Sequence, residues 1–194
     1  MTGKPTILKR TTLAATRFFR IESIDLLFSN GARRTFERLV RGSSSGAVLI
    51  VPLLDDNTVL MVREYAAGVH RYEIGLPKGK VETGEPLFDA ANRELMEEIG
   101  YGAGNLLVLS SFTVAPGYLE HATEIVLARE LYEERRPGDE PEELQVVQWR
   151  LDRLYEHLAA GDCTEARSIA ALFLTREFLD NARARSEQAP RARR

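Results

Sequence analysis

The sequence has few of the residues that build disulfides or zinc sites. Cys163 is its one cysteine, so no disulfide can form within the chain. The three histidines, His70, His121 and His157, lack the close spacing typical of zinc ligands. These absences exclude a disulfide scaffold and favour a reducing, cytoplasmic setting.

Long apolar segments and a strong excess of one charge are also missing. The longest apolar run, residues 47–54, contains Pro52 and is far shorter than the roughly 20 residues that span a bilayer. With 26 Lys and Arg against 29 Asp and Glu, the net charge is -3, whereas a general nucleic-acid binder carries a basic excess. We therefore expect neither a membrane nor a nucleic acid as a partner.

The first part of the chain predicts a small antiparallel β subdomain. Apolar residues alternate over 24–28, the pair Asn30-Gly31 follows, and a second β-rich stretch runs over 36–40. This order is typical of a β-hairpin with a tight turn. The small, polar residues 42–46 then indicate a linker to the next domain.

The rest of the chain mixes strands and helices without regular alternation. Strand-like segments occupy residues 47–54, 58–62, 106–112, 123–131 and 144–151, and helical spacing occurs over 151–158 and 169–179. An α+β, mixed-sheet sandwich fits this order better than a doubly wound fold. We expect a β subdomain over 1–45, a catalytic domain over 46–182 and a basic, disordered tail over 183–194.

Residues 86–99 predict the helix that carries the chemistry. It begins at a proline, which the first helical turn tolerates, and it ends before Gly100. Glu94, Glu97 and Glu98 fall on one strip beside the apolar face. Like charges four residues apart cost about 0.2 to 0.5 kcal/mol, and a divalent cation would reverse that effect. The alternative is an ordinary charged helix face.

A glycine-bearing bend over residues 75–80 precedes this helix and favours the metal-binding interpretation. The sequence reads Gly79, five residues, Glu85, seven residues, then Arg93-Glu94-Leu95-Met96-Glu97-Glu98-Ile99-Gly100. This spacing resembles the Nudix box of the Nudix hydrolases, with Tyr101 where that family usually has an aliphatic residue. Coincidence of so many fixed identities is improbable at ordinary residue usage.

The resemblance implies an α/β/α sandwich with a mixed sheet and a box that forms a loop, a helix and a loop. By position, Glu94, Glu97 and Glu98 would bind Mg²⁺, with Mn²⁺ as an alternative, and the carbonyl of Lys78 would complete the site. Arg93 and Glu85 would brace the helix. The implied reaction is hydrolysis of the pyrophosphate in a nucleoside diphosphate derivative.

The wider resemblance is to a bacterial branch of the family that hydrolyses ADP-ribose, NADH and diadenosine triphosphate. Pro116 lies where the family's ADP-ribose pyrophosphatases have a proline, and Tyr118 lies where its dinucleoside polyphosphate hydrolases often have a tyrosine. Ala66 replaces a typical arginine, which argues against strict ADP-ribose specificity. We expect substrate contacts at Arg63, Glu73, Pro116 and Tyr118.

The acidic segment 133–143 predicts a mobile loop between strands, or simply a solvated run of charge. The resemblance implies that Glu140 or Glu142 swings in as the general base or an additional metal ligand. The sequence does not decide between them, and Glu94 is a third candidate for the base.

Three alternatives remain at this point. The leading one is a pyrophosphohydrolase of relaxed specificity for ADP-linked compounds. The second is a strict ADP-ribose or nucleotide-sugar pyrophosphatase, and the third is a Nudix-fold sensor that binds a nucleotide without cleaving it. The resembling branch also implies a homodimer, because the N-terminal hairpin is too small to form a core alone.

Overall fold

The computed structural model describes residues 3–40 and 46–188, and its first element is a separate three-stranded antiparallel sheet. Its strands are β1 (Thr6–Ala15), β2 (Arg20–Leu27) and β3 (Arg33–Val40). The predicted hairpin is confirmed as β2–β3. Gly31 takes the left-handed φ of 81° in its turn, and Asn30 accepts a hydrogen bond from the Ala32 amide. The sequence did not predict β1.

The remaining strands form two sheets. The first has the order β7-β4-β9-β8 and the second the order β10-β5-β6. Within the four-stranded sheet β4 and β9 pair in parallel and the other neighbours pair antiparallel, so this sheet is mixed, as predicted. The strands are β4 (Gly46–Pro52), β5 (Thr58–Ala66), β6 (Arg71–Gly75), β7 (Lys78–Val81), β8 (Tyr101–Phe112), β9 (Thr123–Glu133) and β10 (Gln145–Arg150).

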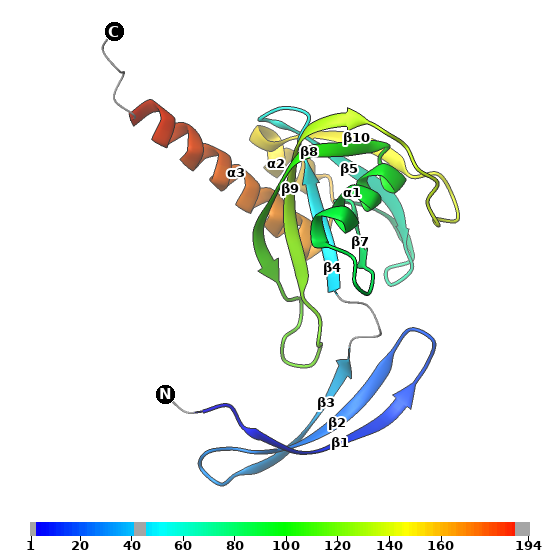
Figure 1. The fold of residues 1–194 in the computed structure, drawn as a ribbon, viewed down its shortest axis with the longest axis vertical. Helices are drawn as coiled ribbons and strands as arrows, with labels where there is room; N and C mark the ends of the chain where they lie inside the picture. Colours follow the sequence, from blue (N-terminus) through cyan, green and yellow to red (C-terminus); the bar gives the residue numbers. More distant parts are fainter. Residues whose placement is uncertain (1–2, 41–45, 189–194) are drawn as a thin grey trace.

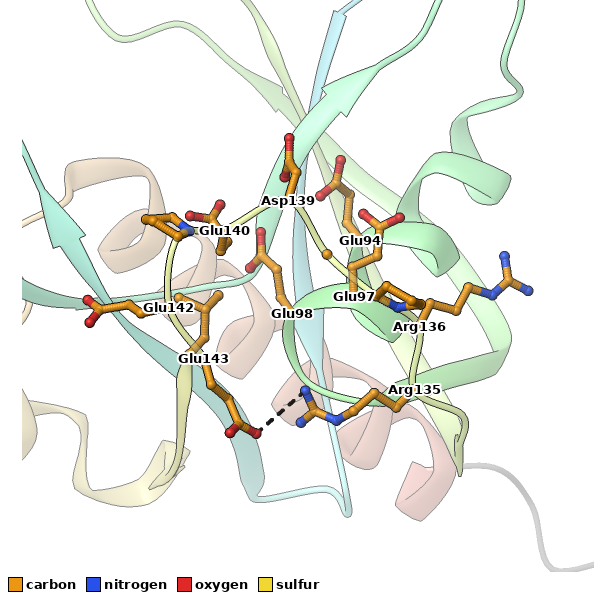
Figure 2. A pocket seen from close by; sticks show the side chains of 13 residues that line it. Glu94, Glu97, Glu98, Arg135, Arg136, Asp139, Glu140, Glu142 and Glu143 are labelled. Carbon is orange, nitrogen blue, oxygen red and sulfur yellow. Dashed lines mark ion pairs between the residues drawn. The ribbon is translucent and has the colours of Figure 1, made fainter.

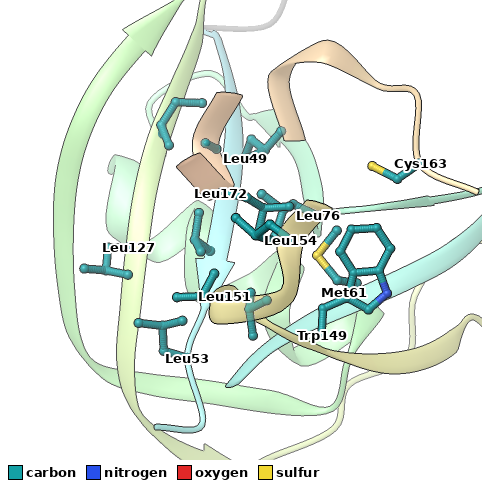
Figure 3. Close-up of a cluster of buried hydrophobic side chains, with 14 of the residues drawn as sticks. Leu49, Leu53, Met61, Leu76, Leu127, Trp149, Leu151, Leu154, Cys163 and Leu172 are labelled. Atoms are coloured by element: carbon teal, nitrogen blue, oxygen red, sulfur yellow. The ribbon is translucent and has the colours of Figure 1, made fainter. Parts of the chain in front are cut away.

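Helices cover both faces of these sheets (Figure 1). They are α1 (Leu87–Glu98), the 3-10 turn η1 (Leu151–Arg153), α2 (Leu154–Ala159) and α3 (Ala166–Gln188). Alternate residues of β4 face opposite layers. Val48 and Ile50 pack with Leu95 of α1, whereas Leu49 and Leu172 belong to the cluster beneath α3 (Figure 3). The predicted α/β/α sandwich is confirmed.

The N-terminal sheet meets the larger domain at residues 115–120. The Leu39 amide donates to the Tyr118 carbonyl at 2.8 Å, and the Glu120 amide donates to the Leu39 carbonyl at 2.8 Å. Arg38 pairs with Glu120 at 3.5 Å. Most of the expected linker, residues 42–45, lies outside the described residues, and Gly46 already belongs to β4.

The C-terminal helix corrects one expectation. Residues 183–188, predicted as the start of a disordered tail, continue α3, and residues 189–194 lie outside the described residues. Alanine and arginine favour helix, and Arg183 donates to the Asp56 carbonyl at 3.1 Å. No helix within residues 3–40 and 46–188 is long and apolar enough to cross a membrane.

Candidate active site

Helix α1 places Glu94 and Glu98 at the edge of its buried face. Ala91 and Leu95 belong to the core on this side of the sheet. The helix ends where Gly100 adopts φ 77° and donates its amide to the Leu95 carbonyl. The two glutamates are 9% and 8% exposed, so their carboxylates are held in a largely desolvated position.

Gly79 lets the preceding strand approach this helix. It lies on β7, opposite Val48 of β4, so part of the predicted loop is a strand. A Cβ atom at Gly79 would lie 1.9 Å from the carboxyl carbon of Glu94. A side chain there would therefore displace the Glu94 carboxylate, and only glycine leaves it in place.

Arg93 organises the carboxylates around it. It donates to Glu85 at 2.9 Å, to Glu94 at 2.8 Å, to Glu97 at 3.2 Å and to the Lys80 carbonyl at 2.9 Å. The bond from Arg93 keeps the pKa of Glu85 below its usual value. The fork geometry of a guanidinium suits several acceptors at once, so one side chain joins α1 to the strand and turn before it.

Glu98 lies beside Lys78 and Glu64. Burial, reinforced by the charges of Glu94 and Glu64 and opposed by Lys78, raises the pKa of Glu98 to about 8. The Lys78 amide donates to Glu98 at 3.4 Å, and the Lys78 ammonium pairs with Glu64 at 2.6 Å. The local excess of buried negative charge is what a bound cation would relieve.

The acidic segment between β9 and β10 encloses the other side of an open cavity of about 700 Å³. Figure 2 shows Glu140 on the side of Glu98 and Asp139 on the side of Glu94. Burial raises the pKa of Glu140, and Glu64 and Asp139 add to that effect. Glu142 points away in Figure 2 and accepts a hydrogen bond from the Tyr72 hydroxyl at 2.7 Å. The geometry therefore separates the two candidates that the sequence left open.

Comparisons with known proteins show the family of this chain. The NUDIX domain model matches residues 44–172, and the model of the NudE-type Nudix hydrolase N-terminal domain matches residues 5–38. The chain belongs to the Nudix family. It is 48% identical to the ADP compounds hydrolase NudE of Escherichia coli K12 over 91% of this chain and 94% of that protein.

A second relative and a solved structure are also named as enzymes that act on ADP compounds. The ADP-ribose pyrophosphatase of Bacillus subtilis strain 168 is 28% identical, over 85% of this chain and 91% of that protein. A solved crystal structure of an ADP compounds hydrolase superposes with a TM-score of 0.85 at 46% identity, covering 94% of this chain and 97% of that one. The resemblance to the Nudix family, and the fold that it implied, are confirmed.

Nudix hydrolases depend on a divalent metal, and the donor set of this chain fits one. Glu94 and Glu98 are nearly buried, burial raises the pKa of both, and carboxylate oxygens are ligands that hard cations prefer. Among residues 3–40 and 46–188, no three acidic, histidine or cysteine side chains converge as a ready-made cage. Arg93 holds one oxygen each of Glu94 and Glu97, so the second oxygen of each carboxylate would be the one to meet a cation.

The predicted substrate residues do not line the cavity beside Glu94. Arg63 pairs with Asp162 at 3.6 Å. Pro116 and Tyr118 line a second pocket, of about 410 Å³, against the N-terminal sheet. The Glu73 carboxylate accepts hydrogen bonds from Arg71 and from the amide and hydroxyl of Thr164. These bonds join β6 to the approach to α3, and substrate contact at Glu73 stays a prediction.

The sequence reasoning missed two acidic residues that act on the site: Asp139, which lines the cavity, and Glu64, which is not part of the lining but raises the pKa of Glu98. Glu64 acts on the site through Lys78, and Asp139 lies next to Glu140. Glu64 adjoins Arg63 and Asp139 adjoins Glu140, two residues that the sequence singled out. Their placement depends on the pairing of β5 with its neighbours and on the path of the acidic segment.

Proposed function

We propose that this Nudix protein hydrolyses the pyrophosphate bond of ADP-linked compounds, with Mg²⁺ as the metal and Mn²⁺ as an alternative. The observation that carries the proposal is the arrangement of the box carboxylates and Glu140 around one open cavity. The substrates would include ADP-ribose, NADH and diadenosine triphosphate. The names of the relatives from E. coli and B. subtilis support this substrate class.

Each group at the cavity has a distinct task in the proposed reaction. Glu94, Glu97 and Glu98 hold the metal, which would neutralise charge on the pyrophosphate and lower the pKa of the attacking water. Glu140 accepts the proton of that water as its oxygen bonds to phosphorus, and the bridging P–O bond breaks. Arg93 keeps the carboxylates on the correct side of α1.

Glu140 suits the role of base better than the other two candidates. Its raised pKa brings it closer to the range in which a base can accept a proton at neutral pH. Glu142 is engaged with Tyr72, and Glu94 accepts a hydrogen bond from Arg93. Glu142 points away from Glu98 in Figure 2, and Glu94 is already assigned to the metal, so Glu140 is the carboxylate left for the base.

A homodimer belongs to the same proposal. All ten residues of β1 are exposed, among them Ile7, Leu8 and Leu13, and Phe18 and Phe19 at the next turn are also exposed. So many uncovered apolar side chains favour burial against a second copy. A cytoplasmic location fits the single, buried and free Cys163.

Two other functions are separable from this one. A strict ADP-ribose or nucleotide-sugar pyrophosphatase would use the same carboxylates but would reject the larger partners of ADP. A nucleotide sensor would need none of these carboxylates, and this chain has all of them. Retention of the complete set favours catalysis.

The experiment is the release of AMP from ADP-ribose with chelator, with Mg²⁺ and with Mn²⁺. We expect no release with chelator and restoration by either metal. Nucleotide binding without AMP release at any metal concentration would favour the sensor and contradict the proposal. Release that persists with chelator would contradict the metal assignment.

A further inference from the structure

The acidic segment, which in the structure comprises residues 134–144 between β9 and β10, is attached at its two ends by different means. At its start, the Glu134 amide donates to the Gly100 carbonyl at 3.1 Å and the Arg136 amide donates to the Met96 carbonyl at 3.0 Å. These backbone bonds fix the first part of the segment to the end of α1. Asp139 and Glu140 follow beyond this attachment, over the cavity.

The C-terminal part of the segment is held by a side chain of β6. The Tyr72 hydroxyl on β6 donates to Glu142 at 2.7 Å. Arg135 also pairs with Glu143, but at 3.9 Å; both attachments lie between exposed groups, and the Tyr72 bond is the shorter. The carboxylate raises the pKa of Tyr72, so the phenol stays a donor throughout the neutral range. The hydroxyl of Tyr72 is therefore the stronger of these two attachments.

The ring of Tyr72 is itself held in place. Tyr65 lies directly opposite it in the β5–β6 ladder, with ring centroids 5.8 Å apart at 69°. The Tyr65 hydroxyl is hydrogen-bonded to His70, which adopts a left-handed φ of 53° in the turn between these strands. Edge-to-face packing of this kind restricts a ring that would otherwise rotate in solvent.

The position of Glu142 limits the position of Glu140. Only Pro141 separates them, and its ring fixes φ near -65°. Two residues span at most about 7 Å, so Glu140 cannot move far while Glu142 is bonded to Tyr72. Glu142 held in this way keeps Glu140 beside Glu98.

We propose that Tyr72 is a positioning residue, which anchors the acidic segment through Glu142 and so keeps Glu140 in place beside Glu98. This inference rests on the proposed function, in which Glu140 is the base. It assigns Glu142 to the anchor, and Tyr65 and His70 to the support of Tyr72. None of these four touches the reacting atoms.

Steady-state kinetics with ADP-ribose test the anchor. Tyr72→Phe removes only the hydroxyl, and we expect kcat to fall about ten-fold, or about 1.4 kcal/mol, with KM within about two-fold. Tyr155→Phe on α2 is the matched control, because its side chain is 75% exposed and remote from the cavity. Equal kcat for the two variants would overturn the proposal.

Variants of Glu142 separate an anchor from a base. Glu142→Gln keeps an amide oxygen that accepts from Tyr72, so we expect kcat within about three-fold of the wild type. Glu142→Ala should match Tyr72→Phe, and the double variant should be no worse than either, because both changes remove the same bond. A Glu142→Gln variant as inactive as Glu140→Gln would overturn the assignment.

Hydrogen–deuterium exchange tests the anchor without any turnover. We expect residues 137–144 to exchange faster in Tyr72→Phe than in the wild type, and at the wild-type rate in Tyr155→Phe. Should the wild type cleave no ADP-linked compound, the proposed function fails while exchange still decides the anchor. Unchanged exchange in Tyr72→Phe would overturn it.

Discussion

Gly79 and the carboxylate of Glu94 occupy adjoining space, and a Cβ on the glycine would lie 1.9 Å from the carboxyl carbon. This close approach joins the first residue of the box to Glu94, the first of its three predicted metal ligands. Gly79 does not adopt a left-handed φ, so backbone conformation does not require a glycine here. The close approach of Glu94 does. Strand β7 and helix α1 are thereby packed close enough to share one site.

Gly79→Ala should impair the enzyme much more than it destabilises the fold. The clash is with the far end of a flexible side chain, so Glu94 can turn away at a cost of about 1 kcal/mol or less, partly offset by the reduced freedom of the unfolded chain. We expect at least a ten-fold loss of kcat/KM, roughly 1.4 kcal/mol. Gly68→Ala, where the added Cβ meets nothing within 4 Å, is the control. Equal activity of the two variants would contradict this explanation of the glycine.

Glu98→Gln should fold and lose nearly all activity. The amide keeps the shape of the side chain but removes the charge of a metal ligand, and the expected loss is at least about 100-fold. Turnover assays at saturating Mg²⁺ would measure the loss of activity, and circular dichroism would show whether the variant folds. Near wild-type turnover at saturating metal would refute the assignment of Glu98 as a ligand.

The metal-free protein should lose stability as the pH rises. The pKa of Glu98 is about 8 in the fold against 4.5 as its ordinary value, so the unfolded chain releases this proton first. Between those two values the folded state binds more protons, and the free energy of unfolding therefore falls with increasing pH. Glu98→Gln should show a shallower slope, with a remainder from Glu94, whose pKa is also raised. Denaturant titrations at pH 5 and about pH 8 would measure the free energy of unfolding of both proteins. An equal change between the two pH values in the wild type and in Glu98→Gln would contradict the assigned burial.

The uncovered N-terminal sheet predicts a dimer in solution. Light scattering should give about twice the chain mass of 21.8 kDa. Leu13→Glu places a charge on the exposed apolar surface of β1 and should weaken association, whereas Thr11→Glu on the same strand is the polar control. A fully active monomer at micromolar concentration would refute the dimer.

The fold was predictable where the local pattern and the tertiary environment agree. The Asn30-Gly31 turn specifies its hairpin chemically, and the apolar spacing of Leu95 and its neighbours specifies the buried face of α1. Strand β1 was missed because all ten of its residues are exposed, so no burial pattern marks it. Strand β7 was missed because it is defined by pairing with β4 instead of by its own residues.

The carboxylates of the candidate site on α1 were predictable, but their complete surroundings were not. The spacing of Glu94 and Glu98 on one helix is a local property and can be read from the sequence. Glu64 reaches the site from another sheet through Lys78, which no local pattern reveals. For Glu73 the motif records only that an acidic residue is present, whereas its bonds to Arg71 and Thr164 depend on the tertiary fold.

Hydrolysis of a panel of ADP-linked compounds tests the central claim most directly. With Mg²⁺ present, ADP-ribose, NADH and diadenosine triphosphate should each yield AMP or ADP, because the carboxylates act on the pyrophosphate and the second group is held loosely. Their values of kcat/KM should lie within about two orders of magnitude, or roughly 2.7 kcal/mol in transition-state binding. Deoxynucleoside triphosphates, which lack a second group across the pyrophosphate, should be poor substrates. Chromatographic quantification that finds efficient cleavage of a deoxynucleoside triphosphate and none of the three ADP compounds would contradict the account.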